Sequence, residues 1–230
     1  MNNTLLLSLV LAHILGDFYL QTDKCCKQKE TRKFKSWFLY IHAITIGLLS
    51  WIVVPSYNFG IWALLIAVSH FIIDAKKIHY PKGLWSFIID QLFHFCVLVV
   101  ISCIYELTKE LPIQMIEYTT SFSIPFLLLA ILLCIKPANI LIKLILNKYQ
   151  VGASESCNNI KNAGALIGNL ERILTIVFVI LGQFEAIGFI VAAKSILRFK
   201  DTDTDKTEYV LAGTFLSFTI AILCGLMTRI

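Results

Sequence analysis

The sequence predicts an all-α membrane protein, a polytopic bundle of about eight spanning or partly spanning helices. Of its 230 residues, 57% are hydrophobic and only 15% are charged, whereas soluble domains are nearer a quarter charged. The mean hydropathy is +0.76, and the apolar residues fall in long runs of the kind that cross a bilayer as helices. The net charge of +5 comes largely from one basic connection, which indicates membrane topology and not binding to nucleic acid.

The apolar runs predict the helices in order. They lie at 4–22, 37–56, 60–76, 84–106, 119–136, 165–182, 184–198 and 208–227. The first run lacks a basic leader and a small-residue cleavage site, so we expect an uncleaved first helix. The segment "NILIKLILNKY" (139–149) predicts an amphipathic helix on the membrane surface. We therefore expect a first bundle over 1–110, a helix with a cytoplasmic linker over 111–162, and a second bundle over 163–230.

Basic residues predict the orientation in the membrane. They concentrate in the connections 24–35 and 76–82, and lysines return between 136 and 161. A hairpin across "PSYNFG" (55–60) would place the first two connections on the same side, and the positive-inside rule makes that side cytoplasmic. The acidic connection "YELTKELPIQMIEY" (105–118) and both termini then lie outside. The expected location is the bacterial cytoplasmic membrane.

Four of the predicted helices carry histidine and aspartate inside their apolar runs. These residues are His13 and Asp17, His42, His70 and Asp74, and Asp90 and His94. Three helices carry a pair spaced four apart, which puts both members on one helical face. Counted from the nearest basic connection, one member in each helix lies six to eight residues inside the membrane, roughly 10 Å at the rise of a helix. The sequence therefore predicts that all four helices present these groups at one depth.

Imidazole and carboxylate groups together indicate a divalent metal, with zinc favoured and iron or manganese as alternatives. All seven groups are expected as ligands, and they exceed the needs of one tetrahedral ion. They allow either two ions, or one ion with carboxylates that orient the imidazoles. Gln21 and Gln91 are expected to hydrogen-bond the ligands. Two other roles stay open for the set: a proton or ion relay, and polar contacts that join the helices.

The second predicted bundle carries Glu171, Arg172 and Lys194 within its apolar runs. One interpretation is a cationic pocket for a phosphate or carboxylate headgroup. The other is ion pairing between helices, with Glu171 bonded to Arg172 or to Lys194.

Several of these motifs together resemble a bacterial integral membrane family of unknown function. The opening pattern H-x-x-G-D-F-x-x-Q is carried by His13, Gly16, Asp17, Phe18 and Gln21. The later patterns G-x-L-E-R and A-A-K-S are intact at 168–172 and 192–195. This resemblance implies no activity. The histidine and aspartate content is also loosely similar to that of bacterial membrane-bound metal-dependent hydrolases, which implies hydrolysis.

The sequence leaves three functions open. The first is a metal-dependent hydrolase of a lipid or lipid-linked substrate, in which Asp17 or Asp90 accepts a proton from water. Arg172 or Lys194 would then hold an anionic headgroup. The second is a membrane scaffold or sensor in which the metal only stabilises the helix bundle. Such a protein would bind a cytoplasmic protein or a second copy of itself. The third is an ion or proton transporter.

Overall fold

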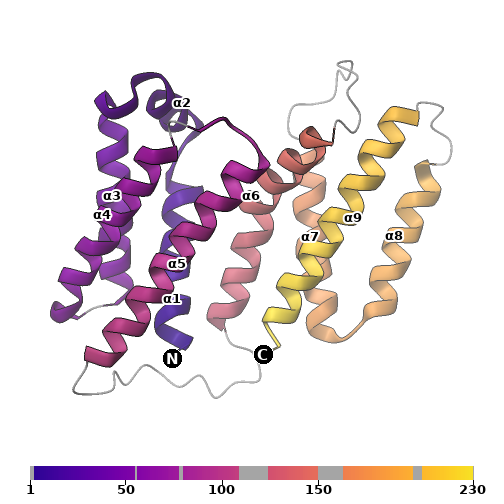
Figure 1. Ribbon diagram of the computed structural model, residues 1–230. Coiled ribbons are helices and arrows are strands. Elements are labelled where there is room, and N and C mark those ends of the chain that lie inside the picture. Colours follow the sequence, from indigo (N-terminus) through magenta and orange to yellow (C-terminus); the bar gives the residue numbers. More distant parts are fainter. Residues whose placement is uncertain are drawn as a thin grey trace. The chain divides into compact units, whose positions relative to one another are not determined.

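The computed structural model describes residues 3–54, 56–77, 80–108, 124–149, 163–198 and 204–229. Figure 1 shows that these residues are helical, and the chain divides into two compact units, Met1–Thr119 and Thr120–Ile230. Within the described residues, five helices are long and apolar enough to cross a membrane. They lie at Tyr57–Lys77, Leu84–Thr108, Ile124–Lys148, Gly164–Leu181 and Thr207–Met227. The expected all-α fold with membrane-spanning helices is confirmed.

The first unit begins with α1 (Asn3–Ile14), which continues as the π-helix η1 (Leu15–Leu20). The polar helix α2 (Asp23–Arg32) and the 3-10 turn η2 (Lys33–Lys35) lead into α3 (Trp37–Val53). The turn η3 (Tyr57–Phe59) connects α3 with α4 (Gly60–Lys77), and α5 (Leu84–Thr108) follows.

Helix α2 was not expected from the sequence, which indicated only a basic connection there. Thr22 begins it as the N-cap: its Oγ1 accepts a hydrogen bond from the backbone N–H of Cys25 at 3.4 Å, which satisfies one of the free donors of the first turn.

Helices α1, α3, α4 and α5 form an antiparallel four-helix bundle (Figure 1). Each helix packs on two neighbours, because α1 and α4 each contact both α3 and α5. Apolar side chains fill the half of this bundle that includes η3. They are Leu5, Leu9, Ile46, Val54, Phe59, Ala63, Ile66, Leu98, Ile101 and Tyr105. We call this group the apolar half of the first unit.

In the second unit, α6 (Ile124–Lys148), α7 (Ala163–Leu181) and α9 (Thr204–Met227) pack on one another, and α8 (Phe184–Arg198) packs on α7 and α9. The chain turns from α7 into α8 at Gly182, whose φ of +72° favours glycine. The backbone N–H of Gln183 donates to the carbonyl of Phe178 at 2.9 Å, so this helix ends in a Schellman motif.

Helix α6 differs from the sequence expectation, which ended one helix near 136 and began a separate surface helix at 139. The structure has one continuous helix with Pro137 inside it. Proline removes one backbone hydrogen bond, and a spanning helix tolerates it where neighbouring helices bond the carbonyls of that turn. The carbonyl that loses its donor belongs to Leu133, four residues before the proline. Arg172 of α7 bonds the next carbonyl of this turn, donating from Nε to Cys134 O at 2.5 Å.

Helix α6 lies within the compact unit Thr120–Ile230. Three parts of the sequence expectation lie outside the described residues: most of the outer connection, residues 150–162 of the linker, and His79. The division of the chain into three parts stays a prediction.

Small residues let α3 and α4 approach closely. A Cβ atom on Gly47 would lie 2.8 Å from the Cβ of Ala67 and 3.0 Å from the carbonyl oxygen of Ala63. We expect Gly47→Ala to lower the free energy of unfolding by about 1–3 kcal/mol, because overpacking forces the two backbones apart. Thermal unfolding in detergent measures the change. Gly60→Ala is the matched control, because its Cβ would make only ordinary contact with Trp51 at 3.8 Å; equal melting temperatures for the two variants would contradict the prediction.

Candidate metal centre

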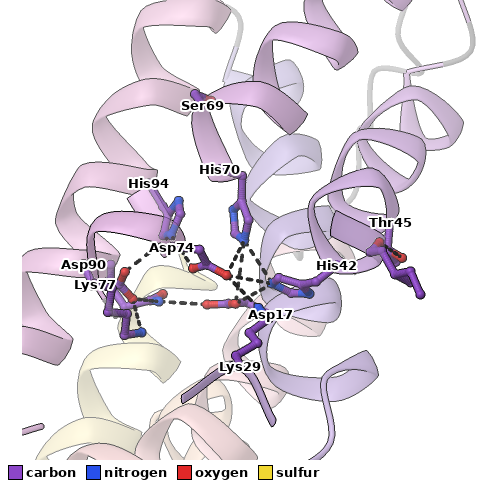
Figure 2. A network of polar contacts seen from close by, with 12 residues as sticks. Asp17, Lys29, His42, Thr45, Ser69, His70, Asp74, Lys77, Asp90 and His94 are labelled. Carbon is purple, nitrogen blue, oxygen red and sulfur yellow. Dashed lines mark hydrogen bonds and ion pairs between the residues drawn. The ribbon is translucent and has the colours of Figure 1, made fainter. Parts of the chain in front are cut away.

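All seven histidine and aspartate side chains come together inside the first unit, at the end opposite its apolar half. Figure 2 shows six of them pointing toward one another from η1, α3, α4 and α5. The seventh, His13 of α1, joins the group, with its ring centroid 5.0 Å from that of His94. The side chains are largely buried, from 2% exposed for His70 to 10% for Asp17. The sequence prediction of one shared depth agrees with this arrangement.

Local helix geometry positions these groups. The spacing of four residues puts His70 and Asp74 on one face of α4, and Asp90 and His94 on one face of α5. Asp17 lies in η1, and single π turns within helices often occur at functional sites. Gly16 precedes it at a close contact with α3, where a Cβ atom would collide with the side chain of Ile46.

One group of ligand atoms comes from Asp17, His42, His70 and Asp74. His42 Nε2 lies 3.1 Å from Asp17 Oδ1, 3.0 Å from His70 Nε2 and 3.9 Å from Asp74 Oδ2. His70 Nε2 lies 4.0 Å from each of those two carboxylate oxygens. Atoms bound to zinc at about 2.0–2.2 Å in a tetrahedron stand about 3.3–3.6 Å apart. These separations are close to what a single cation requires.

A second group lies beside the first and comes from Asp74, Asp90 and His94, and His13 forms a further group with His70 and His94. His94 Nε2 lies 3.6 Å from Asp90 Oδ1 and 3.8 Å from Asp74 Oδ1. Three ligand-type atoms in these two groups, His13 Nε2, Asp90 Oδ1 and His94 Nε2, are buried and have no hydrogen-bond partner among the described residues. Buried polar atoms are nearly always bonded. His94 Nε2 and Asp90 Oδ1 face each other at ion-pair distance, and a bound cation would satisfy all three atoms.

Two lysines that the sequence analysis missed contact the carboxylates. Lys29 of α2 donates from Nζ to Asp74 Oδ2 at 2.7 Å, and Lys77 of α4 donates to Asp90 Oδ2 at 2.5 Å. The spacing of Lys77 three residues after Asp74 could have indicated its position, since both lie on one helical face. No sequence signal indicated Lys29, because its helix was not expected.

The two glutamines behave differently. Gln91 donates from Nε2 to Asp17 Oδ2 at 2.8 Å and to Asp90 Oδ2 at 3.2 Å, so it contacts two of the carboxylates expected as ligands. Gln21 is the residue at which η1 ends, with φ −81° and ψ 120°. The ligand-orienting role of both glutamines stays a prediction.

Two exposed tryptophans lie near this cluster along the sequence. Trp37 at the start of α3 is 78% exposed and Trp85 at the start of α5 is 62% exposed, and tryptophan favours the membrane–water interface. His42 and Asp90 each follow one of these tryptophans by five residues, about 7.5 Å along a helix. The two side chains therefore lie at the same distance along their helices from an exposed tryptophan, and the depth of the cluster in the membrane stays a prediction.

In the second unit, the three expected polar residues separate into two sets. Lys194 of α8 donates from Nζ to Glu171 Oε2 of α7 at 2.7 Å, so these two form an ion pair between helices. Arg172 is 2% exposed and turns the other way, toward α6 and α9. Arg172 donates four described hydrogen bonds, and each acceptor is a neutral oxygen atom. The acceptors belong to Cys134, Asn139, Asn169 and Ser217.

We expect Arg172→Met to lower the free energy of unfolding by about 2–4 kcal/mol, because it removes the donor that acceptors of α6 and α9 share. Lys194→Met is the matched control: its ion pair is partly exposed (26% and 18% for the two side chains) and is worth about 1 kcal/mol or less. Thermal unfolding in detergent compares the two variants. A similar loss in both would show that the hydrogen bonds of Arg172 contribute nothing special.

Comparison with known proteins bears on the first unit. Residues 5–123 match the family described as "Protein of unknown function (DUF3307)". The match includes every residue of the cluster, whereas the G-x-L-E-R and A-A-K-S motifs lie beyond it. No curated protein and no solved structure matches the chain. The expected resemblance is confirmed, and the chain belongs to the DUF3307 family of proteins of unknown function.

Proposed function

We propose that this chain is a metal-dependent hydrolase embedded in the membrane, acting on a lipid or lipid-linked substrate. The observation that carries the proposal is the set of unbonded buried atoms, His13 Nε2, Asp90 Oδ1 and His94 Nε2. Leaving such atoms without a partner is costly in a low-dielectric interior. A divalent cation would bond all three, and their chemistry suits zinc, with iron or manganese as alternatives.

The cluster offers groups for acid–base chemistry besides ligands. A bound divalent cation lowers the pKa of a coordinated water toward neutrality. Asp17 or Asp90 would then accept a proton from water, since each carboxylate lies among the imidazoles that would hold the cation. Gln91 bonds both carboxylates and would fix their orientation.

The depth of the cluster supports a substrate that is anchored in the bilayer. A centre one to two turns below the interfacial tryptophans is at the level where lipid headgroups join their chains. Lysines of α2 and α4 lie at this end of the first unit, which supports the cytoplasmic side by the positive-inside rule. A bond near a lipid headgroup would reach the centre without leaving the membrane.

Transport fits the first unit less well than hydrolysis. A through-path for ions or protons needs polar groups at graded depths across the bilayer. The apolar half of the first unit instead fills the other end of the bundle with aliphatic and aromatic side chains. These side chains favour a centre that opens to one side only.

Metal content is the first test. Elemental analysis of the detergent-purified chain, after growth with added zinc, iron and manganese, should find a near-stoichiometric metal. The double variant His13→Ala/His70→Ala should lose it, because each histidine supplies a ligand atom to the cluster. His79→Ala is the control, because the sequence places this histidine in a basic connection. Wild-type protein that holds no metal under these conditions would refute the hydrolase.

The rate of lipid hydrolysis distinguishes the hydrolase from a scaffold whose metal only stabilises the fold. We expect Asp17→Asn to keep the fold and the melting temperature while lowering lipid hydrolysis at least 100-fold, because the amide cannot accept the proton of water. A screen of lipid esters and phosphoesters in mixed micelles provides the rate. A variant that unfolds, with no substrate found for the wild type, would favour the scaffold.

A further inference from the structure

We propose that the cluster binds two cations, bridged by the carboxylate of Asp74, and that the two cations together hold the phosphate group of a phosphate ester. This inference rests on the metal-dependent hydrolysis proposed above and specifies the substrate of that same centre. Four features carry it: the two faces of Asp74, the unbonded atoms beside it, the balance of charge, and the exposure of Lys77.

Asp74 faces both groups of ligand atoms, with a different oxygen toward each. Its Oδ2 lies 3.9 Å from His42 Nε2 and 4.0 Å from His70 Nε2. Its Oδ1 lies 3.8 Å from His94 Nε2. Carboxylates with this disposition bridge the ions of two-metal centres, which stand about 3.5–4 Å apart.

Each of the two positions has ligands of its own. Asp17 and His42 belong only to the first group, whereas His13 and Asp90 belong to groups that do not include His42. The first position is already close to tetrahedral spacing without the atoms of the second. A single cation there would leave His13 Nε2, Asp90 Oδ1 and His94 Nε2 still unbonded, and a second cation removes that cost.

The net charge of the cluster with two cations bound favours a negatively charged substrate. The ammonium groups of Lys29 and Lys77 already offset two of the three carboxylates, Asp17, Asp74 and Asp90. Two divalent cations would therefore leave a clear surplus of positive charge, and a buried surplus must be neutralised. A phosphate ester brings its negative charge to the reacting atom itself, whereas a carboxylic ester or an amide brings none.

Lys77 marks where the phosphate reaches the centre. Its side chain is 42% exposed, whereas that of Asp90, which it contacts, is 3% exposed. Lys29 beside Asp74 is 9% exposed. An incoming phosphate thus meets the ammonium of Lys77 first, and a charge-assisted hydrogen bond there would guide it inward.

Hydrolysis then adds water across a P–O bond. The oxygen of water bonds to phosphorus, the P–O bond to the alcohol breaks, and the leaving oxygen keeps the bonding electron pair. One proton of the water passes to Asp17 or Asp90 and then to the alcohol. The products are the alcohol and the phosphate, and no oxidant or reductant is needed.

Manganese stoichiometry and magnetism test the two-cation centre. The purified full-length chain, loaded with Mn²⁺, should hold about two ions per chain with an exchange-coupled spectrum by electron paramagnetic resonance. His42→Gln and His94→Gln remove ligands of different ions. Each should leave one ion with an uncoupled spectrum.

The possible stoichiometries separate the two proposals. One ion in the wild type, lost equally in His42→Gln and His94→Gln, would overturn the two-cation centre and leave a one-metal hydrolase standing. No ion in the wild type would overturn both. Gel filtration confirms that each variant is folded, and Asp74→Asn gives a further check: it should weaken or abolish the coupling even where both ions stay bound.

Inorganic phosphate probes the substrate class. Calorimetry should detect phosphate binding to the manganese-loaded wild type, and about tenfold weaker binding to Lys77→Met. Lys76→Met is the matched control, because this neighbouring lysine is exposed and lies on another helical face. Displacement of phosphate by phosphatidic acid in micelles would indicate a lipid substrate, and displacement by p-nitrophenyl phosphate a soluble one. Failure of the loaded protein to bind phosphate, or of both esters to displace it, would overturn the phosphate ester.

Discussion

The constraint that governs the first unit is the cost of placing ionised groups inside an apolar bundle. The side chains of three carboxylates are at most 10% exposed, and each needs hydrogen bonds and opposite charge there. This requirement explains features that are far apart in the sequence. Lys29 brings α2 over the end of the bundle, Lys77 ends α4 beside Asp90, and Gln91 joins Asp17 with Asp90. With neutral imidazoles the cluster still has one carboxylate more than its lysines offset.

Much of this site could be predicted because two simple rules act together. A helix rises a fixed distance per residue, and basic residues mark where it leaves the membrane. Counting inward from the lysines therefore placed Asp17, His42, His70 and Asp90 at one depth before their contacts were known. The spacing of four residues added Asp74 and His94 on the same faces. These polar residues could be recognised as candidates for a site because ionisable residues are rare in membrane-spanning helices.

The rest depended on contacts between segments distant in sequence. The contact of Lys29 with Asp74 joins residues 45 positions apart, and the polar sequence of α2 has no apolar periodicity to reveal a helix. In α6, the apolar run was expected to end near 136, whereas the helix continues through Pro137. The contacts of α6 with α7 and α9 that accompany this continuous helix join segments far apart in the sequence.

Arg172 also has a consequence for how the second unit is made. A lone arginine at the centre of a helix costs roughly 2.5–3.5 kcal/mol to pass from the translocon into lipid. Its oxygen partners on α6 are synthesised before it, whereas Ser217 on α9 comes 45 residues later. Helix α7 therefore gains most by leaving the translocon together with α6, and its last bond forms when α9 arrives. The order of synthesis and the buried guanidinium together make membrane insertion of this unit cooperative.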